Sequence, residues 1–256
     1  METNEYTIMN EQDYISHWGV NAKQHFDNGD YEWLCGFIKH FVGNHCGIAE
    51  IGCGAGYSSL AFIQNGFDVA AIDTNQEALN ATLQLLQKHK YQDSIVTAQL
   101  DAVHEMNGII SFIGGNRFPV DIVVLCNPGG NLKPDLSQAE YKLLRMFGFK
   151  EDELIQHVLC GEIHLLHKWS LIYAACSLSI MMDKMLVIVD RGSKAELEQA
   201  LELIQHNAGI HRIASDLRKI ENEPDGGIPL GKTDTEQYWG VALYNPIEGV
   251  LSQEDN

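Results

Sequence analysis

Residues 49–59 read AEIGCGAGYSS, and this stretch decides how the rest of the chain is interpreted. An apolar run, Gly47–Ile51, leads into three glycines, Gly52, Gly54 and Gly56, and a helical pattern follows. Glycine permits a tight turn and lets a ligand approach the backbone closely. The first turn of a helix adds N–H groups that have no partner within the helix. The stretch therefore predicts a buried strand, a ligand-binding loop and a helix.

Short apolar runs alternate with helical patterns along the rest of the chain. The expected strands are Gly47–Ile51, Phe67–Asp73, Ser94–Leu100, Val120–Cys126 and Lys184–Asp190. The expected helices are Tyr57–Gln64, a segment capped by Asn75 that runs to Lys88, Val103–Ile113 and Ala195–His206. This alternation predicts an α/β fold with a doubly wound, mostly parallel sheet of seven strands. The last two runs, Ile210–Ile220 and Tyr238–Tyr244, have no helix between them and predict an antiparallel edge hairpin.

We interpret the chain, residues 1–256, as a single domain with two helical additions. Residues 1–45 form a helical N-terminal region, and residues 133–182 form a helical insertion between the fourth and fifth strands. In open α/β sheets, ligands bind beyond the carboxyl ends of the strands. We therefore expect the N-terminal region to act as a lid and the insertion as a substrate wall. A plain helical cover without a role in the site is the alternative.

The composition excludes several classes of function. The formal net charge is −18, and such a field repels phosphate backbones and anionic lipid. The charge therefore disfavours a nucleic-acid partner, and we expect no membrane partner. The six cysteines are scattered without a C-x-x-C pair, so no metal site is expected. The first residues are polar and acidic, and the most apolar stretch, Leu171–Met182, is too short to span a bilayer. These features favour a cytoplasmic protein.

Two ligand classes use a glycine loop of this kind. A dinucleotide loop has the spacing G-x-G-x-x-G, and the position of its third glycine is occupied here by Tyr57. The spacing in this chain is G-x-G-x-G, with the acidic Glu50 two positions before the first glycine. This arrangement resembles motif I of the class I S-adenosylmethionine-dependent methyltransferases. An NAD-dependent oxidoreductase is therefore the less favoured alternative.

The resemblance continues downstream and implies a Rossmann-like fold with S-adenosyl-L-methionine as the cofactor. In that family an acidic residue at the position of Asp73 accepts hydrogen bonds from both ribose hydroxyls. A second acid, at the position of Asp101, meets the adenine amino group, and a backbone N–H at Ala102 meets the adenine ring. The implied cofactor-binding residues are Glu50, Gly52, Cys53, Gly54, Gly56, Tyr57, Asp73, Thr74, Asp101, Ala102 and Asn127.

The acceptor of the methyl group is less well indicated. Asn127-Pro128 resembles the start of the Asn-Pro-Pro-Tyr/Phe motif of enzymes that methylate planar amines, but two glycines replace the proline and the aromatic residue. Asn127 offers a donor and an acceptor, which suits the orientation of an amine or a hydroxyl. His164 and His167 are candidate bases that would share a helix face at a spacing of three.

We therefore expect a methyltransferase that acts on a small molecule by in-line displacement, with Asn127, His164 and His167 as the catalytic candidates. A protein or nucleobase acceptor is an alternative. A protein that binds adenosylmethionine without catalysis is another. The oligomeric state is left open.

Overall fold

The computed structural model describes residues 11–126, 135–220 and 236–246. In this part of the chain seven strands form one sheet in the order β3-β2-β1-β4-β5-β7-β6. The strands are β1 (Gly47–Ile51), β2 (Asp68–Asp73), β3 (Ile95–Gln99), β4 (Ile122–Cys126), β5 (Met185–Gly192), β6 (Ile210–Lys219) and β7 (Tyr238–Pro246). The first five are parallel to one another, β7 is antiparallel to β5, and β6 is antiparallel to β7. The predicted seven-stranded α/β fold is confirmed.

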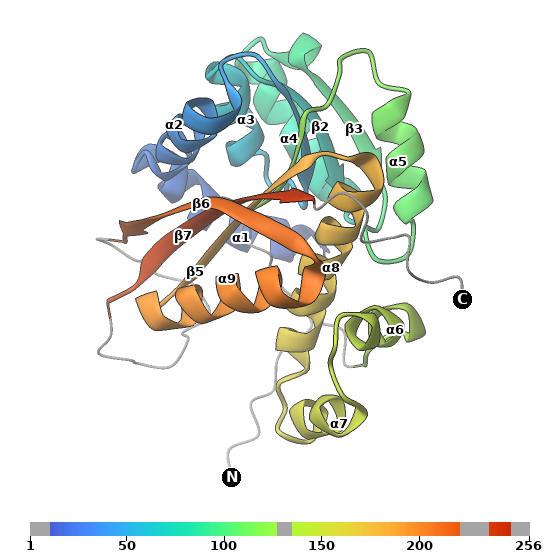
Figure 1. Cartoon of the computed structure of the whole chain (residues 1–256). Helices are drawn as coiled ribbons and strands as arrows, with labels where there is room; N and C mark the ends of the chain where they lie inside the picture. Colours follow the sequence, from blue (N-terminus) through green and yellow to red (C-terminus); the bar gives the residue numbers. More distant parts are fainter. Residues whose placement is uncertain (1–10, 127–134, 221–235, 247–256) are drawn as a thin grey trace.

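Helices cover both faces of this sheet (Figure 1). They are α1 (Glu11–Asp27), α2 (Asp30–Val42), α3 (Tyr57–Gln64), α4 (Gln76–Lys88), α5 (Met106–Gly114), α6 (Gln138–Met146), α7 (Glu151–Leu159), α8 (Ile163–Met182) and α9 (Lys194–Ala208), with a short 3₁₀ turn at Gln92–Ser94. One hydrophobic core joins the sheet to α2, α3 and α4. The other joins its opposite face to α5, α8, α9 and the insertion.

The strand register brings several strand ends to one edge of the sheet. Ile51, the last residue of β1, lies opposite Ile72 on one side and Leu125 on the other. The next residue of β4, Cys126, lies opposite Val189 of β5. The carboxyl ends of β1, β2, β4 and β5 therefore lie at the same edge of the sheet, as parallel strands require.

The hairpin made by the last two strands is antiparallel, as predicted, but the final strand β7 lies inside the sheet and β6 forms the edge. The burial of the two strands explains this order. Residues 239–244 of β7 are all buried, whereas in β6 only Ile210 is buried and the other positions are half-buried or exposed. The pairing of β6 also shifts register between Arg212 and Ala214. The more apolar strand takes the position that is covered on both faces.

The predicted insertion contains one helix that belongs to the fold itself. Helix α8 is the crossover between β4 and β5 and packs on both strands, while α6 and α7 lie beside its first half (Figure 1). At 20 residues α8 is longer than the predicted apolar stretch, and it is long and apolar enough to span a membrane by composition. In this structure 56% of its apolar window is buried within the protein, as in a core helix.

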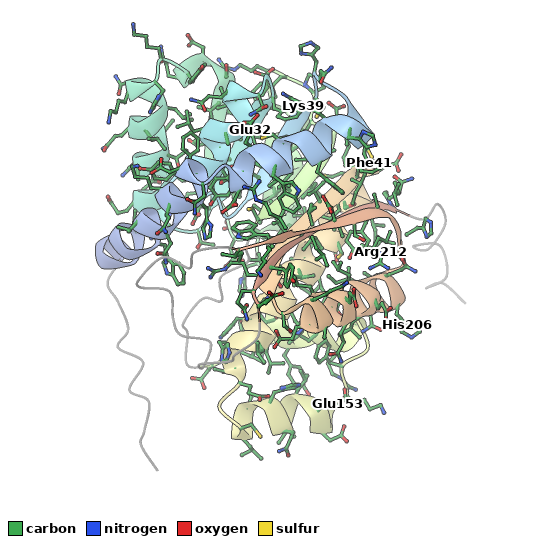
Figure 2. All side chains as sticks on the ribbon, turned by 90° about the vertical axis from the view of Figure 1, so that its left-hand side faces the viewer. Glu32, Lys39, Phe41, Glu153, His206 and Arg212 are labelled. Atoms are coloured by element: carbon green, nitrogen blue, oxygen red, sulfur yellow. The ribbon has the colours of Figure 1, made fainter. Side chains whose placement is uncertain are left out.

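The N-terminal region forms two helices that lie across one side of the molecule, as seen in Figure 2, where Glu32, Lys39 and Phe41 mark α2. Helix α2 packs on α3, and α1 packs on α2, α3 and α4. A Cβ atom at Gly19 of α1 would lie 3.5 Å from the Cβ of Ala55 in the glycine loop. Helix α1 thus passes directly over this loop.

Candidate functional site

The glycine loop has a backbone that only glycine adopts readily. Gly52, Gly54 and Gly56 have φ angles of 76°, 54° and 82°. A Cβ at Gly56 would lie 2.7 Å from the hydroxyl oxygen of Thr82 on α4, so this glycine permits close packing of the loop on that helix. A Cβ at Gly52 or Gly54 would meet nothing within 4 Å. Those two positions therefore border open space, where a ligand can approach the backbone.

Asp73 at the end of β2 fixes the loop. Its Oδ2 accepts a hydrogen bond from the Gly54 N–H at 2.9 Å, and its Oδ1 accepts one from the Asn75 N–H at 2.9 Å. Burial raises the pKa of Asp73, although the hydrogen bonds from Asn75 and Gly54 oppose this shift. Each carboxylate oxygen keeps a second lone pair. The ribose contact expected for Asp73 stays a prediction.

Glu50 at the end of β1 contacts the helix that follows the glycine loop. It is fully buried, and its two carboxylate oxygens accept hydrogen bonds from the hydroxyls of Ser58 and Ser59. Burial raises the pKa of Glu50 to about 7, despite the opposing effect of the two serine hydrogen bonds. The side chain therefore holds the first turn of α3 against β1. The cofactor contact expected for Glu50 stays a prediction.

Three other predicted cofactor residues surround the loop at different depths. Cys53 is buried, with its sulfur 3.6 Å from the Thr82 hydroxyl. Tyr57 is half-buried, and its ring centroid lies 5.9 Å from that of Phe26 on α1. Thr74 is exposed next to Asp73. Tyr57 and Thr74 thus lie at the surface beside the loop, whereas the Cys53 side chain points from the loop into the protein and contacts Thr82 of α4.

Asp101 organises the loop that follows β3. Its Oδ1 accepts hydrogen bonds from the N–H groups of Val103 at 2.8 Å and His104 at 3.2 Å. Its Oδ2 lies 2.9 Å from Nδ1 of His104, whose Nε2 lies 2.9 Å from the hydroxyl of Ser137 at the start of α6. Ala102 is buried beside it. These contacts link the loop expected to hold the adenine to the insertion.

Comparison with known proteins supports the interpretation of this loop. The family model of the tellurite resistance protein TehB matches residues 40–113, which run from α2 through α5. A candidate RNA methyltransferase from Pyrococcus horikoshii superposes with a TM-score of 0.51 at 15% identity, covering 85% of this chain and 83% of that one. The chain has the class I methyltransferase fold. A comparison with curated protein sequences finds no match.

Two further solved structures resemble this methyltransferase fold at lower scores. The N-methyltransferase NodS from Bradyrhizobium japonicum, solved with S-adenosyl-L-homocysteine, has a TM-score of 0.49 at 12% identity and covers 87% of this chain and 88% of its own. TrmK from M. capricolum, also solved with S-adenosyl-homocysteine, has a TM-score of 0.43 at 16% identity and covers 83% and 67%. At these identities the likeness concerns the fold.

The two histidines on α8 that are catalytic candidates differ in burial. His164 is exposed, whereas His167 is buried with Nδ1 2.6 Å from Oε1 of Glu140 on α6. Burial tends to raise the pKa of Glu140, but the hydrogen bonds from His167 and Ser137 outweigh it, and the pKa falls to about 2. The contact between His167 and Glu140 therefore joins α8 to α6. His164 lies on the same helix but faces solvent. Asn127, the third catalytic candidate, lies outside the described residues.

Two hollows on the described surface differ in their position relative to the glycine loop. One, of about 900 Å³, lies between α9 and β6 at the sheet edge remote from this loop, and its lining includes Glu202, His206 and Arg212. His206 and Arg212 are labelled in Figure 2. The smaller, about 430 Å³, opens where α1 and α4 meet beside Ala55 and Tyr57. The smaller hollow therefore adjoins the loop.

The structure also brings together polar residues that the sequence does not single out. Asn21 and His25 on α1 and Trp239 on β7 are buried, and the rings of His25 and Trp239 lie 4.8 Å apart. Nδ1 of His25 lies 2.8 Å from Oδ2 of Asp30. The spacing of Asn21 and His25 on one helix was visible in the sequence. The contact of His25 with a strand more than 200 residues away was not.

Proposed function

We propose that this protein binds S-adenosyl-L-methionine at the glycine loop and transfers its methyl group to a small-molecule acceptor. The observation that carries the proposal is the loop itself. Gly52 and Gly54 adopt positive φ angles beside open space, and Asp73 is held against Gly54 at the end of the neighbouring strand. A Cβ at either glycine would fill the space that a sugar and an amino-acid chain need.

The acidic side chains near the loop fit a ligand that has hydroxyls and an amino-substituted ring but no phosphate. Asp73 and Asp101 supply carboxylate oxygens, which accept hydrogen bonds from hydroxyl or amino groups. Negative side chains at both strand ends disfavour a pyrophosphate, because like charges repel. Adenosylmethionine carries these hydrogen-bond donors, and when bound it supplies a methyl group on a positively charged sulfur. We assign Asp73 to the ribose hydroxyls, and Asp101 with the Ala102 N–H to the adenine.

The remaining work of the protein is to orient the acceptor and exclude water, because the cofactor carries the reactive group. Helix α1 covers the loop at Ala55 and Tyr57 and is our candidate for the lid. Helices α6 and α7, tied to the loop after β3 through His104 and Ser137, are our candidates for the substrate wall. We place the acceptor between them.

The acceptor class rests on charge. The net charge of −18 opposes the approach of a phosphate backbone, so a small molecule is favoured over RNA or DNA. A polar or aromatic metabolite that is uncharged or positively charged fits such a field. The cytoplasm, where adenosylmethionine and such acceptors meet, is the proposed location.

Calorimetry with adenosylmethionine, S-adenosyl-L-homocysteine and NAD tests the cofactor. We expect binding of the first two in the micromolar range and no binding of NAD. Binding of NAD alone would overturn the proposal. Incubation with tritium-labelled methyl donor and separated small-molecule, RNA and protein fractions of a cell extract tests the acceptor. Label in the RNA or protein fraction would contradict a small-molecule acceptor, and absence of label from every fraction would indicate a binding protein.

A further inference from the structure

Arg191 is a half-buried cation near the carboxyl end of β5. Its backbone N–H donates a hydrogen bond to Oδ1 of Asp190 at 2.8 Å, but its guanidinium makes no hydrogen bond or ion pair with any residue that the structure describes. A charge that is partly removed from water is costly unless an opposite charge pairs with it. Arg191 is therefore arranged to meet an anion that the described fold does not supply.

The side chain of Arg191 lies on the face of the sheet that α2 covers. Side chains alternate between the two faces of a strand, and Val189, two positions earlier, belongs to the core beneath α2, α3 and α4. Burial raises the pKa of the Tyr31 hydroxyl on α2 and of the Cys126 thiol at the end of β4, and the Arg191 charge opposes both shifts. The guanidinium is therefore near the end of β4, where Cys126 is partly accessible.

The acidic side chains that act on the same tyrosine and cysteine already have partners. These acids are Asp30, Glu50 and Asp190. Asp30 pairs with Arg218 at 3.1 Å, and Asp190 pairs with Lys168 at 2.5 Å. Both carboxylate oxygens of Glu50 accept hydrogen bonds from serine hydroxyls. Each of these carboxylates is thus engaged elsewhere, and the guanidinium on β5 is left for an anion from outside the described chain.

The strand register places Arg191 beyond the same edge of the sheet as the glycine loop. Glu50 of β1 lies opposite Val124 of β4, which lies opposite Val187 of β5. Gly54 and Arg191 each come four residues after their member of this row, so both lie beyond the level at which β1 ends. Only β4 separates the two strands, which makes two strand spacings, about 10 Å in all. The open space beside Gly54 and the Arg191 side chain therefore belong to one edge.

The assignments made above direct the cofactor along this edge toward Arg191. They place the adenine at Asp101 after β3, the ribose at Asp73 at the end of β2, and the amino-acid chain at the loop after β1. These three strands are neighbours in the sheet, and β4 and β5 come next in the same order. The amino-acid end of the cofactor, which carries an ammonium group and a carboxylate, is therefore the end nearest to β5.

Resting on the function proposed above, we propose that Arg191 binds the carboxylate at the amino-acid end of adenosylmethionine and makes the protein select cofactors that carry this group. A guanidinium presents two parallel N–H donors to a carboxylate, so it is suited to this recognition. Decarboxylated adenosylmethionine has the same sulfur and the same methyl group but lacks the anion. It should therefore be a poor methyl donor for this protein.

Calorimetry on the full chain tests this selection with two compounds. The first is S-adenosyl-L-homocysteine, and the second is S-adenosyl-3-thiopropylamine, which lacks only the carboxylate. We expect the first to bind at least tenfold more tightly, the loss that accompanies one hydrogen bond to a charged group. The acidic chain by itself favours the second compound, which has one more net positive charge. Equal or tighter binding of the second compound would overturn the proposal.

Arg191→Gln tests the residue, with Arg212→Gln as its matched control. Arg212 is also half-buried, but it lies on β6 at the sheet edge remote from the loop. We expect Arg191→Gln to bind S-adenosyl-L-homocysteine at least tenfold more weakly and the thiopropylamine like the native protein. Arg212→Gln should bind both like the native protein. If Arg191→Gln binds both compounds normally, or loses affinity for both equally, Arg191 does not contact the carboxylate.

Arg191→Lys keeps the charge but not the two parallel donors. We expect it to recover part of the affinity for S-adenosyl-L-homocysteine that Arg191→Gln loses, and an affinity no better than that of Arg191→Gln would contradict the pairing of charges. If the native protein binds neither compound, the function proposed above fails and this inference fails with it. Tight binding of both compounds by the native protein, without preference, overturns the inference alone.

Discussion

Oδ2 of Asp73 accepts a hydrogen bond from the N–H of Gly54, so the carboxylate that ends β2 also sets the conformation of the loop that follows β1. The two residues are 19 positions apart in the chain, but Asp73 ends β2, and Gly54 follows β1, the strand that pairs with β2. This bond ties the loop geometry to the acidic side chain proposed to meet the ribose. A change at Asp73 should therefore affect cofactor binding more than it affects the fold.

We expect Asp73→Asn to weaken binding of S-adenosyl-L-homocysteine at least tenfold. The amide keeps one acceptor oxygen and loses the charge, and a hydrogen bond to a charged group contributes about 1.5–3 kcal/mol. Calorimetry measures the loss, and circular dichroism checks the fold. Asp68→Asn, at the exposed opposite end of β2, is the matched control and should bind like the native protein. Equal affinities in the two variants would show that Asp73 does not contact the ligand.

Glu50 should make the stability of the protein depend on pH. Burial raises its pKa from 4.5 to about 7 in the folded state. Between those pH values the folded protein retains a proton that the unfolded chain has lost, so the free energy of unfolding falls as the pH rises. The protonated Glu50 makes its full contribution to the free energy of unfolding below pH 4.5, and this contribution is lost above pH 7. The change in the free energy of unfolding between these pH values is on the order of 3 kcal/mol.

Urea unfolding at several pH values between 4 and 8 measures this effect. Glu50→Gln cannot titrate, so its unfolding free energy should change less across this window than that of the native protein. The difference between the two proteins isolates Glu50 from the other carboxyl groups, including Asp73, whose pKa is also raised by burial. Parallel curves for the two proteins would contradict the prediction.

Gly56 should matter mainly for stability, and Gly54 mainly for cofactor binding. Gly56→Ala places a Cβ 2.7 Å from the Thr82 hydroxyl and 2.8 Å from its Cα, and we expect it to destabilise the protein by about 2 kcal/mol or more. Gly54→Ala meets no neighbour within 4 Å, so its cost is limited to that of the positive φ angle. It should still weaken cofactor binding by occupying the ligand space. Thermal unfolding and calorimetry on both variants would reveal equal effects if this distinction is wrong.

The contact between Glu140 and His167 should support stability without taking part in chemistry. Glu140→Ala leaves a buried histidine without this partner, and we expect a loss of about 1–3 kcal/mol at neutral pH. Because hydrogen bonding lowers the pKa of Glu140 to about 2, this contribution is present above pH 4.5 and is lost as the pH falls toward 2. His164→Ala, at an exposed position, should change stability by no more than about 0.5 kcal/mol. Urea unfolding of both variants provides the measurement, and similar losses would contradict the assignment.

Helix α1 should respond to the cofactor if it is a lid. Gly19 adjoins Ala55 in the loop, so a ligand at the loop should slow local opening of this helix. We expect slower hydrogen exchange over residues 18–26 when S-adenosyl-L-homocysteine is added. Protection confined to the loop and to Asp73 would argue for a fixed cover.

Local patterns in the sequence determined the framework of this protein. The three glycines required positive φ angles, Asn75 capped α4 through bonds to the N–H groups of Glu77 and Ala78, and the apolar runs marked the strands. These features depend on backbone sterics and on neighbours a few residues apart, so the sequence contains what is needed to predict them. The carboxyl edge of the sheet, and with it the general place of the site, follows from the alternation of strands and helices.

Tertiary structure decided what each polar side chain does. Glu50 is satisfied by serines of the next helix, His167 turns to Glu140 while His164 faces solvent, and Trp239 reaches His25 across the fold. These outcomes depend on which surfaces become buried together. A buried polar group must find a partner among the side chains that packing brings near it. In these examples the partner is from 8 to more than 200 positions away in the chain. Spacing along the chain does not encode the result of that competition.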